Sequence, residues 1–322
     1  RFPIEWQMEM RDGLRPRFTG EPPRWKRPQR RTQDVSMFQL ERAKISKVRA
    51  RGYIAPLSDI QALLYFFSVQ KGDDDIRMVY DGTKSGLNDV LFAPWFCLPT
   101  VDTLARSMAN GYWSADNDYG EMFLNFWLHP DLRPFCGIDL SRSFPEELRE
   151  GQSTLWEAWT RNAMGLRPSP YASCQTGTRL KYLMLGNRRD PSNVFRWERI
   201  VLNLPGSEEY DPSQPWVYKA RSDGSIAADI HKYVDDVRET APTREEVEYA
   251  SSRVAKIAAY FGCQDAARKK RDASQKPGSW AGANVESIVT GVFKTVSQER
   301  WDKTKQLIND IEGWSTLPSM PR

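Results

Sequence analysis

Two adjacent carboxylates follow a short apolar run in the second half of the chain. Within residues 226–238, Ile and Ala residues lead to Tyr233, and Asp235 and Asp236 follow after one valine. This pattern predicts a strand, a tight turn and a second strand, with both carboxylates at the turn. Because like charges side by side repel one another, a divalent cation that offsets them readily explains the pair. Asp is also a common turn residue, so a metal site needs a third carboxylate from elsewhere.

A candidate for the third carboxylate lies in residues 114–126. This stretch contains Asp116 and Asp118, and Asp118 ends a segment that reads as a short strand, with Phe123 five residues later. Asp116 competes with Asp118 for the role of ligand. Two sites far apart in the sequence therefore offer three carboxylate ligands, and oxygen ligands of this kind suit hard cations such as Mg²⁺.

Six stretches between residues 76 and 282 carry a resemblance to a known family. In chain order they are residues 76–88, 118–126, 164–170, 233–236, 268–270 and 276–282. They resemble, in the family's order, the fingers motif, motifs A, B and C, the basic end of motif D and the primer-grip turn of motif E. The chain thus resembles the polymerase domain of a reverse transcriptase of retrotransposon type.

The resemblance implies RNA-directed DNA synthesis by two-metal nucleotidyl transfer to a primer 3′-hydroxyl. Asp118, Asp235 and Asp236 would be the catalytic residues and the ligands of two Mg²⁺ ions, with Mn²⁺ as a substitute. In the family an aromatic residue that faces the ribose lies five positions after the first aspartate, so Phe123 favours Asp118 over Asp116. A ring there would block a 2′-hydroxyl. The alternative for Phe123 is core packing.

The resemblance also assigns residues that bind the incoming nucleotide. The β-rich residues 63–69 and 76–80 predict a hairpin. On it Arg77, with Lys71 nearby, would bind the triphosphate, since a guanidinium can contact two phosphate oxygens at once. The alternative for Arg77 is an ordinary exposed arginine on a strand.

Three more residues are assigned to substrate binding by the same resemblance. Tyr119 follows the motif A aspartate, and Gly165 in motif B would let template or nucleotide approach the backbone closely. Lys269 would lie near the leaving pyrophosphate. The alternative for the basic residues 268–271 is a solvated loop.

Composition bounds the class of protein. The chain has 322 residues, 40% of them hydrophobic, and a formal net charge of +4, so it can bury a core and is only mildly basic overall. Its 4 cysteines lack metal-binding spacing, which favours a reducing, intracellular location. No apolar run approaches the roughly 18 residues needed to span a membrane, so no membrane partner is expected.

The expected fold is α+β: a right-hand polymerase palm, with an antiparallel sheet backed by helices, plus fingers. The expected domains are a basic Pro- and Arg-rich arm at 1–52, fingers at 53–108, a palm with a finger segment at 109–286, and the start of a thumb or connection at 287–322. Residues 186–224 read as an insertion without an assignable function. The arm is expected either to be solvated or to contact a nucleic-acid backbone. Helices are predicted over residues 100–109, 171–185, 243–261 and 297–311.

The expected partners are an RNA or DNA template with its primer and deoxynucleoside triphosphates. Two other functions stay open. An RNA-dependent RNA polymerase shares the palm but usually has an acidic residue where Phe123 stands. A domesticated, non-catalytic nucleic-acid-binding relative would typically have lost part of the carboxylate triad, all of which is present here.

Overall fold

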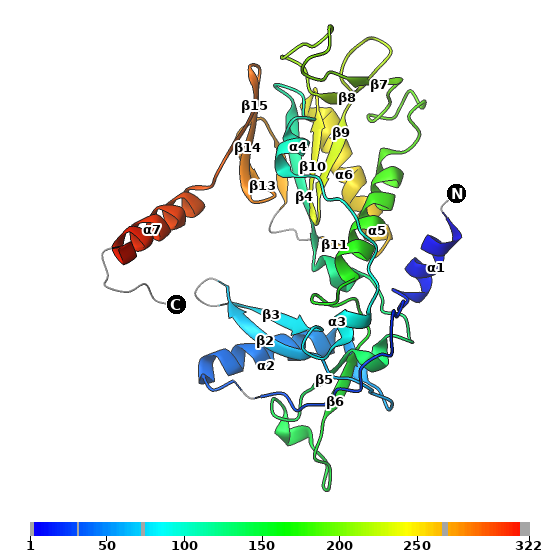
Figure 1. Ribbon diagram of the computed structural model, residues 1–322. Coiled ribbons are helices and arrows are strands. Elements are labelled where there is room, and N and C mark those ends of the chain that lie inside the picture. Colours follow the sequence, from blue (N-terminus) through cyan, green and yellow to red (C-terminus); the bar gives the residue numbers. More distant parts are fainter. Residues whose placement is uncertain (1–2, 31, 72–74, 266–269, 316–322) are drawn as a thin grey trace. The chain divides into compact units, whose positions relative to one another are not determined.

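The chain folds into two compact units (Figure 1), described by a computed structural model for residues 3–30, 32–71, 75–265 and 270–315. Unit 1 comprises Arg1–Phe96 and Glu121–Arg179, and unit 2 comprises Cys97–Gly120 and Leu180–Arg322. The chain therefore passes from one unit to the other at three places, and neither unit is a continuous segment.

Unit 1 combines helices with two small antiparallel sheets. Its helices are α1 (Ile4–Asp12), α2 (Val35–Ala50), α3 (Leu87–Val90), the first part of α5 (Ser169–Leu185) and the 3₁₀ helices η1 (Met122–Asn125), η2 (Arg133–Phe135) and η3 (Pro145–Glu147). Its strands are β1 (Ile54–Pro56), β2 (Tyr65–Gln70), β3 (Ile76–Asp81), β5 (Gly137–Asp139) and β6 (Trp156–Trp159). One sheet has the order β1-β6-β5, and β2 pairs with β3 in the other. The predicted hairpin around residues 63–80 is thus confirmed.

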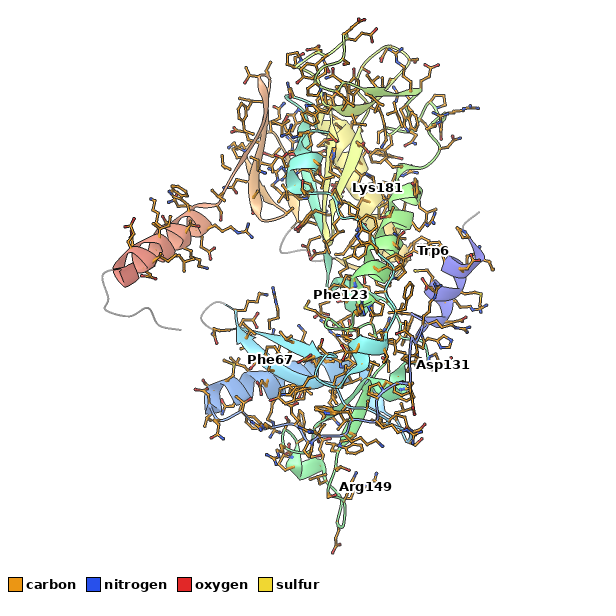
Figure 2. All side chains as sticks on the ribbon, viewed as in Figure 1. Trp6, Phe67, Phe123, Asp131, Arg149 and Lys181 are labelled. Carbon is orange, nitrogen blue, oxygen red and sulfur yellow. The ribbon has the colours of Figure 1, made fainter. Side chains whose placement is uncertain are left out.

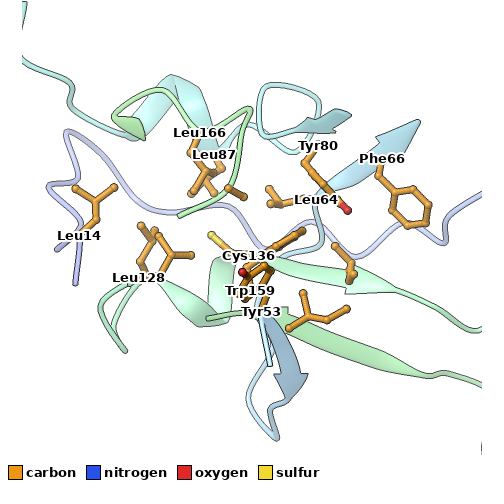
Figure 3. Close-up of a cluster of buried hydrophobic side chains, with 14 of the residues drawn as sticks. Leu14, Tyr53, Leu64, Phe66, Tyr80, Leu87, Leu128, Cys136, Trp159 and Leu166 are labelled. Carbon is orange, nitrogen blue, oxygen red and sulfur yellow. The ribbon is translucent and has the colours of Figure 1, made fainter. Parts of the chain in front are cut away.

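The core of unit 1 collects apolar side chains from its whole length (Figure 3). The ring of Tyr80 meets that of Trp159 edge to face, with centroids 4.7 Å apart. Leu14 and Ile45 belong to the same core, so residues 1–52 do not form a wholly solvated arm, which was one of the two expectations for them. The burial of these two side chains ties the amino-terminal segment to the rest of unit 1.

Unit 2 contains a larger antiparallel sheet and two hairpin-like additions. Its helices are α4 (Val101–Ala105), the second part of α5, α6 (Arg244–Tyr260) and α7 (Gln298–Ser315). Its strands are β4 (Trp113–Gly120), β7 (Arg199–Leu202), β8 (Val217–Ala220), β9 (Asp229–Tyr233), β10 (Asp236–Ala241), β11 (Gln264–Asp265), β12 (Arg271–Ser274), β13 (Gly278–Trp280), β14 (Ala283–Ile288) and β15 (Gly291–Thr295).

Strand β4 is the centre of the large sheet. The order is β11-β4-β10-β9, and β12 also pairs with β4. Strands β13, β14 and β15 form a separate antiparallel sheet, and β7 pairs with β8 within the expected insertion. The chain is therefore a mixed α/β protein with antiparallel sheets.

Local sequence explains the helices of unit 2. Helix α6 begins where the Thr243 side chain accepts a hydrogen bond from the Glu246 amide, and Val247, Ala250 and Val254 are buried along one face. Helix α4 is shorter than the predicted 100–109: Thr100 and Thr103 form a reciprocal cap, but the helix ends after Ala105. Within the described ranges, none of the helices has the length and apolar character needed to cross a membrane.

Candidate active site

The register between β4 and β10 brings two of the predicted carboxylates together. Asp118 is the direct cross-strand partner of Asp236, and Asp116 is the partner of Arg238. Side chains two residues apart on a strand point to the same face of a sheet. These four charged side chains therefore share one face of the sheet in unit 2.

The third predicted carboxylate lies in the turn between β9 and β10. Tyr233 and Asp236 form the last pair of this hairpin, so Val234 and Asp235 make a two-residue turn. The amide of Tyr119 donates to the carbonyl oxygen of Asp235 at 3.1 Å, which ties the turn to β4. Val234 has φ of 53°, a conformation that costs a β-branched residue about 1–3 kcal/mol. The hairpin therefore holds Asp235 beside Asp236 in spite of local strain.

Asp116 is committed to a buried ion-pair network. Arg238 donates from Nε and Nη2 to its two oxygens, at 2.6 and 2.9 Å, and Arg271 donates from Nε to Oδ2 at 2.8 Å. Both Asp116 and Arg238 are buried. The Asp116 carboxylate is thus held by two guanidinium groups, which makes it a poor candidate for a metal ligand. The choice of Asp118 over Asp116 as a metal ligand stays a prediction.

A pocket of about 340 Å³ opens beside the carboxylates. Its walls are formed by residues of β4 and β10 on one side and of the β13–β14 turn on the other: Asp116, Asn117, Asp118, Asp236, Ser279, Trp280, Ala281 and Gly282. Ala281 and Gly282 have φ of 49° and 77°, as required by a two-residue hairpin turn that connects strands of opposite direction. The stretch predicted as a primer-grip turn therefore lines the same pocket as the carboxylates.

Arg238 connects the two walls of this pocket. Its guanidinium carbon lies 5.2 Å from the centroid of the Trp280 ring, and its Nη2 donates to the Gly278 carbonyl oxygen at 3.3 Å. Arg238 thus neutralises Asp116 and supports the β13–β14 turn at the same time. The sequence alone did not suggest a role for it.

The carboxylate face fits a hard divalent cation in its donor chemistry. Asp118 is 4% exposed and is the cross-strand partner of Asp236, so both carboxylates lie on one face of the sheet and line the same pocket. Carboxylate oxygens are the ligands that Mg²⁺ prefers. Among the described residues, no three His, Cys, Asp or Glu side chains stand close enough together to form a complete ligand set. Asp118 and Asp236 are therefore the pair that could hold a metal, with Asp235 next to them in the turn.

The predicted triphosphate ligands lie in unit 1. Arg77 is exposed on β3, opposite Val69. Lys71 is also exposed, and its ammonium lies 3.6 Å from the carboxylate of Asp75, which Lys44 approaches to 2.7 Å. These contacts reduce the positive charge that Lys71 can offer to a phosphate. Lys269 lies outside the described residues.

Gly165 and Phe123 also belong to unit 1. A Cβ atom on Gly165, at φ of 109°, would lie 1.6 Å from the carbonyl oxygen of Tyr80, so packing within unit 1 already requires glycine here. Phe123, labelled in Figure 2, is half-buried in η1. The roles of both residues in binding a nucleotide stay predictions.

The side chain of Tyr119, which was predicted to bind substrate, points away from the face that carries Asp118 and Asp236. Because it neighbours Asp118 on β4, its side chain points to the opposite face of the sheet. The ring is buried there, and its hydroxyl donates to the sulfur of Met184 at 3.6 Å. Burial raises the pKa of this hydroxyl. The side chain of Tyr119 therefore supports the sheet and does not line the pocket.

A buried acid lies on that opposite face as well. Asn117 donates from Nδ2 to Oε1 of Glu239 at 3.1 Å and to the Ser251 hydroxyl at 2.9 Å. Burial raises the pKa of Glu239 to about 8, and the bond from Asn117 offsets this only in part. Between about pH 4.5, where the unfolded carboxyl ionises, and about pH 8, the folded chain therefore keeps a proton that the unfolded chain has lost. Glu239 makes the fold less stable as pH rises through that window.

Comparison with solved structures places this geometry in a known fold. The foamy viral protease-reverse transcriptase dRH in complex with ds DNA is 16% identical, with a TM-score of 0.59 over 90% of this chain and 41% of that one. The chain has a reverse-transcriptase-like fold. The foamy viral protease-reverse transcriptase in complex with an RNA/DNA hybrid gives a TM-score of 0.60 at 16% identity, over 89% of this chain and 30% of that one.

A third structure, the same kind of viral protein in complex with dsDNA, is 16% identical with a TM-score of 0.59, over 91% of this chain and 48% of that one. The chain thus spans less than half the length of these relatives. No family model and no curated protein matches the chain. The likeness therefore rests on the fold and identifies neither the type of element nor the activity.

Proposed function

We propose that this chain is the fingers and palm portion of a retrotransposon-type reverse transcriptase, an RNA-directed DNA polymerase. The observation that carries the proposal is the cross-strand pair of Asp118 and Asp236 beside a pocket whose other wall is the β13–β14 turn. The reverse-transcriptase-like fold of the chain supports it. Unit 2 would then contain the palm and the start of a thumb.

In this proposal Asp118, Asp235 and Asp236 hold two Mg²⁺ ions. When bound, the ions would activate the primer 3′-hydroxyl and stabilise the leaving pyrophosphate. The chain's own task is to hold charged groups in place before substrate arrives. The bond from the Tyr119 amide fixes the turn that carries Asp235, and the pairing of β4 with β10 fixes the other two carboxylates. Such preorganisation lowers the cost of collecting negative charge at one point.

The substrates would be a template with its primer and deoxynucleoside triphosphates. Lys71 and Arg77 would bind the triphosphate, and Lys269 would assist near the pyrophosphate. Phe123 would exclude a 2′-hydroxyl by its bulk, and Gly165 would sit near template or nucleotide. The complexes of the foamy viral proteins with DNA and with an RNA/DNA hybrid support nucleic acid as the partner here too.

The test is extension of a labelled DNA primer on an RNA template in Mg²⁺ by the wild-type chain and by Asp235→Asn. We expect the variant to lose extension by several orders of magnitude, because an amide cannot replace a carboxylate ligand of a hard cation. Asp89→Asn is the matched control, since Asp89 is exposed in α3 and also loses one charge.

Fluorescence anisotropy with the same primer-template separates loss of chemistry from loss of binding. Undiminished extension by Asp235→Asn would refute the two-metal assignment. Tight binding without extension by the wild-type chain would favour a non-catalytic nucleic-acid-binding relative instead.

A further inference from the structure

A second pocket lies in the segment to which the sequence assigned no function. It has a volume of about 540 Å³ and is formed mainly by residues 188–198 and 221–222. Its lining includes one aromatic residue, Trp197, and one acidic residue, Glu198. Four arginines also line it: Arg188, Arg189, Arg196 and Arg221. All of these residues belong to unit 2. This arrangement concentrates positive charge in a concave site.

The charge of this arginine pocket is only partly neutralised within the protein. Arg221 donates from Nη2 to the carboxylate of Glu246 at 2.9 Å. Within the described ranges, the other three arginines come within 4 Å of no carboxylate oxygen, and Arg188 instead bonds to the Glu198 carbonyl and stacks 4.3 Å from the Trp197 ring centroid. Guanidinium groups gathered in this way repel one another unless an anion enters between them.

Arg221 is the most firmly held of the arginines that line the pocket. Its side chain is 9% exposed, and its position is fixed by Glu246 and by the Val194 carbonyl oxygen, which accepts from Nη2 at 3.1 Å. Its Nε is buried and has no hydrogen-bond partner among the described residues. A buried guanidinium N–H without a partner is costly.

We propose that this arginine pocket is a second nucleic-acid site, which binds backbone phosphates of a single strand. Guanidinium groups bind phosphate oxygens in a bidentate way, and the three arginines without a carboxylate partner among the described residues line a pocket of about 540 Å³, larger than one phosphate group fills. The pocket therefore suits consecutive phosphates better than one small anion. That the pocket binds phosphate groups follows from its arginines alone. That these phosphates belong to a nucleic-acid strand, and not to free phosphate, rests on the proposed function.

The site is distinct from the carboxylate pocket. Arg221 directly follows β8 and is held by Glu246 in the first turn of α6, beyond the end of β10 at Ala241. Asp236 is the first residue of β10 and so lies at the opposite end of that strand from Ala241. A strand of this length spans about 20 Å, so a phosphate bound here would lie far from the reacting groups. Figure 1 shows β7 and β8 at the end of unit 2 opposite to β11.

The experiment compares Arg189→Ala/Arg196→Ala with the charge-matched Arg199→Ala/Lys256→Ala. Arg199 and Lys256 are exposed residues of β7 and α6 that do not line the pocket. Both double variants are made in the Asp235→Asn chain and are studied without Mg²⁺ or nucleotides, so the measured binding is independent of catalysis. The probe is a fluorescent single-stranded oligodeoxynucleotide of about 16 nucleotides, followed by anisotropy at several salt concentrations.

We expect the pocket double to bind about tenfold more weakly at about 0.1 M salt. The slope of log K against log salt should become shallower by about 1.4, as for two lost phosphate contacts on a single strand. The control double should change neither quantity by a comparable amount. Thermal melting of both doubles shows whether either substitution affects the fold.

Three results would overturn the proposal. Equal losses in both doubles would mean that only net charge matters. Unchanged binding of an oligonucleotide with a neutral methylphosphonate backbone would show that phosphates are not recognised. Dependence on Arg189 and Arg196 for inorganic phosphate, but not for the oligonucleotide, would make this a site for a free phosphate.

Discussion

Replacing Asp116 by asparagine removes the negative charge from the most deeply buried ion-pair network of the site. The variant leaves Arg238 and Arg271 facing each other across a neutral amide. The new amide side chain can accept hydrogen bonds through one oxygen only, so at least one of the three guanidinium contacts is lost. We expect the fold of unit 2 to be strongly destabilised.

The magnitude follows from burial. The side chain of Arg238 is 2% exposed, so its charge is screened little by water, whereas that of Arg271 is 22% exposed and is screened more. Breaking a buried ion pair by removal of one partner costs about 3–5 kcal/mol. With a urea m value of roughly 3 kcal/mol/M, the midpoint of unfolding should fall by about 1 M or more.

The assay is urea denaturation followed by circular dichroism, in Mg²⁺-free buffer, for Asp116→Asn and Asp118→Asn side by side. Asp118 differs from Asp116 by only two positions on the same strand face, which makes it a matched control. Its removal relieves repulsion from Asp236, because like charges directly opposite on neighbouring strands destabilise a sheet. Because it also relieves this repulsion, we expect Asp118→Asn to lower stability less than Asp116→Asn does, and to lose Mg²⁺-dependent primer extension.

Two results would refute this division of roles. A stability loss in Asp118→Asn as large as that in Asp116→Asn would make both aspartates structural. A wild-type urea midpoint in Asp116→Asn would show that the buried network contributes little.

Three further perturbations address other parts of the molecule. Glu239→Gln should abolish most of the stability loss that the wild type shows as pH rises from about 4.5 to 8, measured by urea midpoints across that range. Gly165→Ala should destabilise unit 1 by at least about 2 kcal/mol, seen in thermal melting, because the new Cβ would overlap the Tyr80 carbonyl oxygen. Phe123→Val should admit ribonucleotides while deoxynucleotide incorporation falls less, measured as kcat/KM for single additions, because it removes a repulsive element.

Each of these has a matched control. Glu245→Gln changes an exposed acid of α6 and should keep the wild-type pH profile, so the same profile in Glu239→Gln would contradict the first prediction. Gly52 also has positive φ, but nothing lies within 4 Å of a Cβ placed there, so an equal cost for Gly52→Ala would mean strain and not overlap. The control for Phe123→Val is Phe67→Val, which changes an exposed ring of β2 and should leave the preference for deoxynucleotides unchanged. If Phe123→Val lowers both nucleotide efficiencies together, with reduced stability, Phe123 is a core residue.

Local patterns in the sequence predicted the elements that are held by local chemistry. The β9–β10 hairpin, the β2–β3 hairpin and helix α6 all appear at or near their predicted positions. Each has its own signal: an apolar run that stops at carboxylates, a loop between two β-rich runs, and a capping threonine before a periodic apolar face. The register of β4 against β10 brings two of the three predicted carboxylates, Asp118 and Asp236, onto one face of the sheet.

What the sequence did not predict depends on contacts between distant segments. The Pro- and Arg-rich composition of the amino-terminal stretch hides Leu14 and Ile45, whose burial depends on partners from elsewhere in unit 1. Arg271 was grouped with basic residues of a possible solvated loop, yet it lies in β12 and binds Asp116. Only the register of β4 against β10 and β12 reveals that Asp116 needs these partners. The pattern Asp-x-Asp, opposite Asp-x-Arg in an antiparallel pair, would have revealed Arg238.

The interleaving of the two units has a consequence for synthesis of the chain on the ribosome. Strand β4 emerges long before its neighbours, since Asp116 and Arg238 are separated by 122 residues. At about 5–20 residues per second, the central strand waits roughly 6–24 s for its main pairing partner. During that interval both of its edges are unpaired, which for an apolar strand would invite aggregation.

The amino-acid composition of β4 lowers this risk of aggregation. Serine, asparagine and two aspartates occupy much of Trp113–Gly120. A strand with these residues is a poor template for aggregation while the nascent chain is incomplete, because charge and low β-propensity oppose self-pairing. The later arrival of Arg238 and Arg271 then turns the same charges into contacts that hold the sheet together. The same polar residues of β4 thus oppose self-pairing in the unfinished chain and hold the sheet together in the finished one.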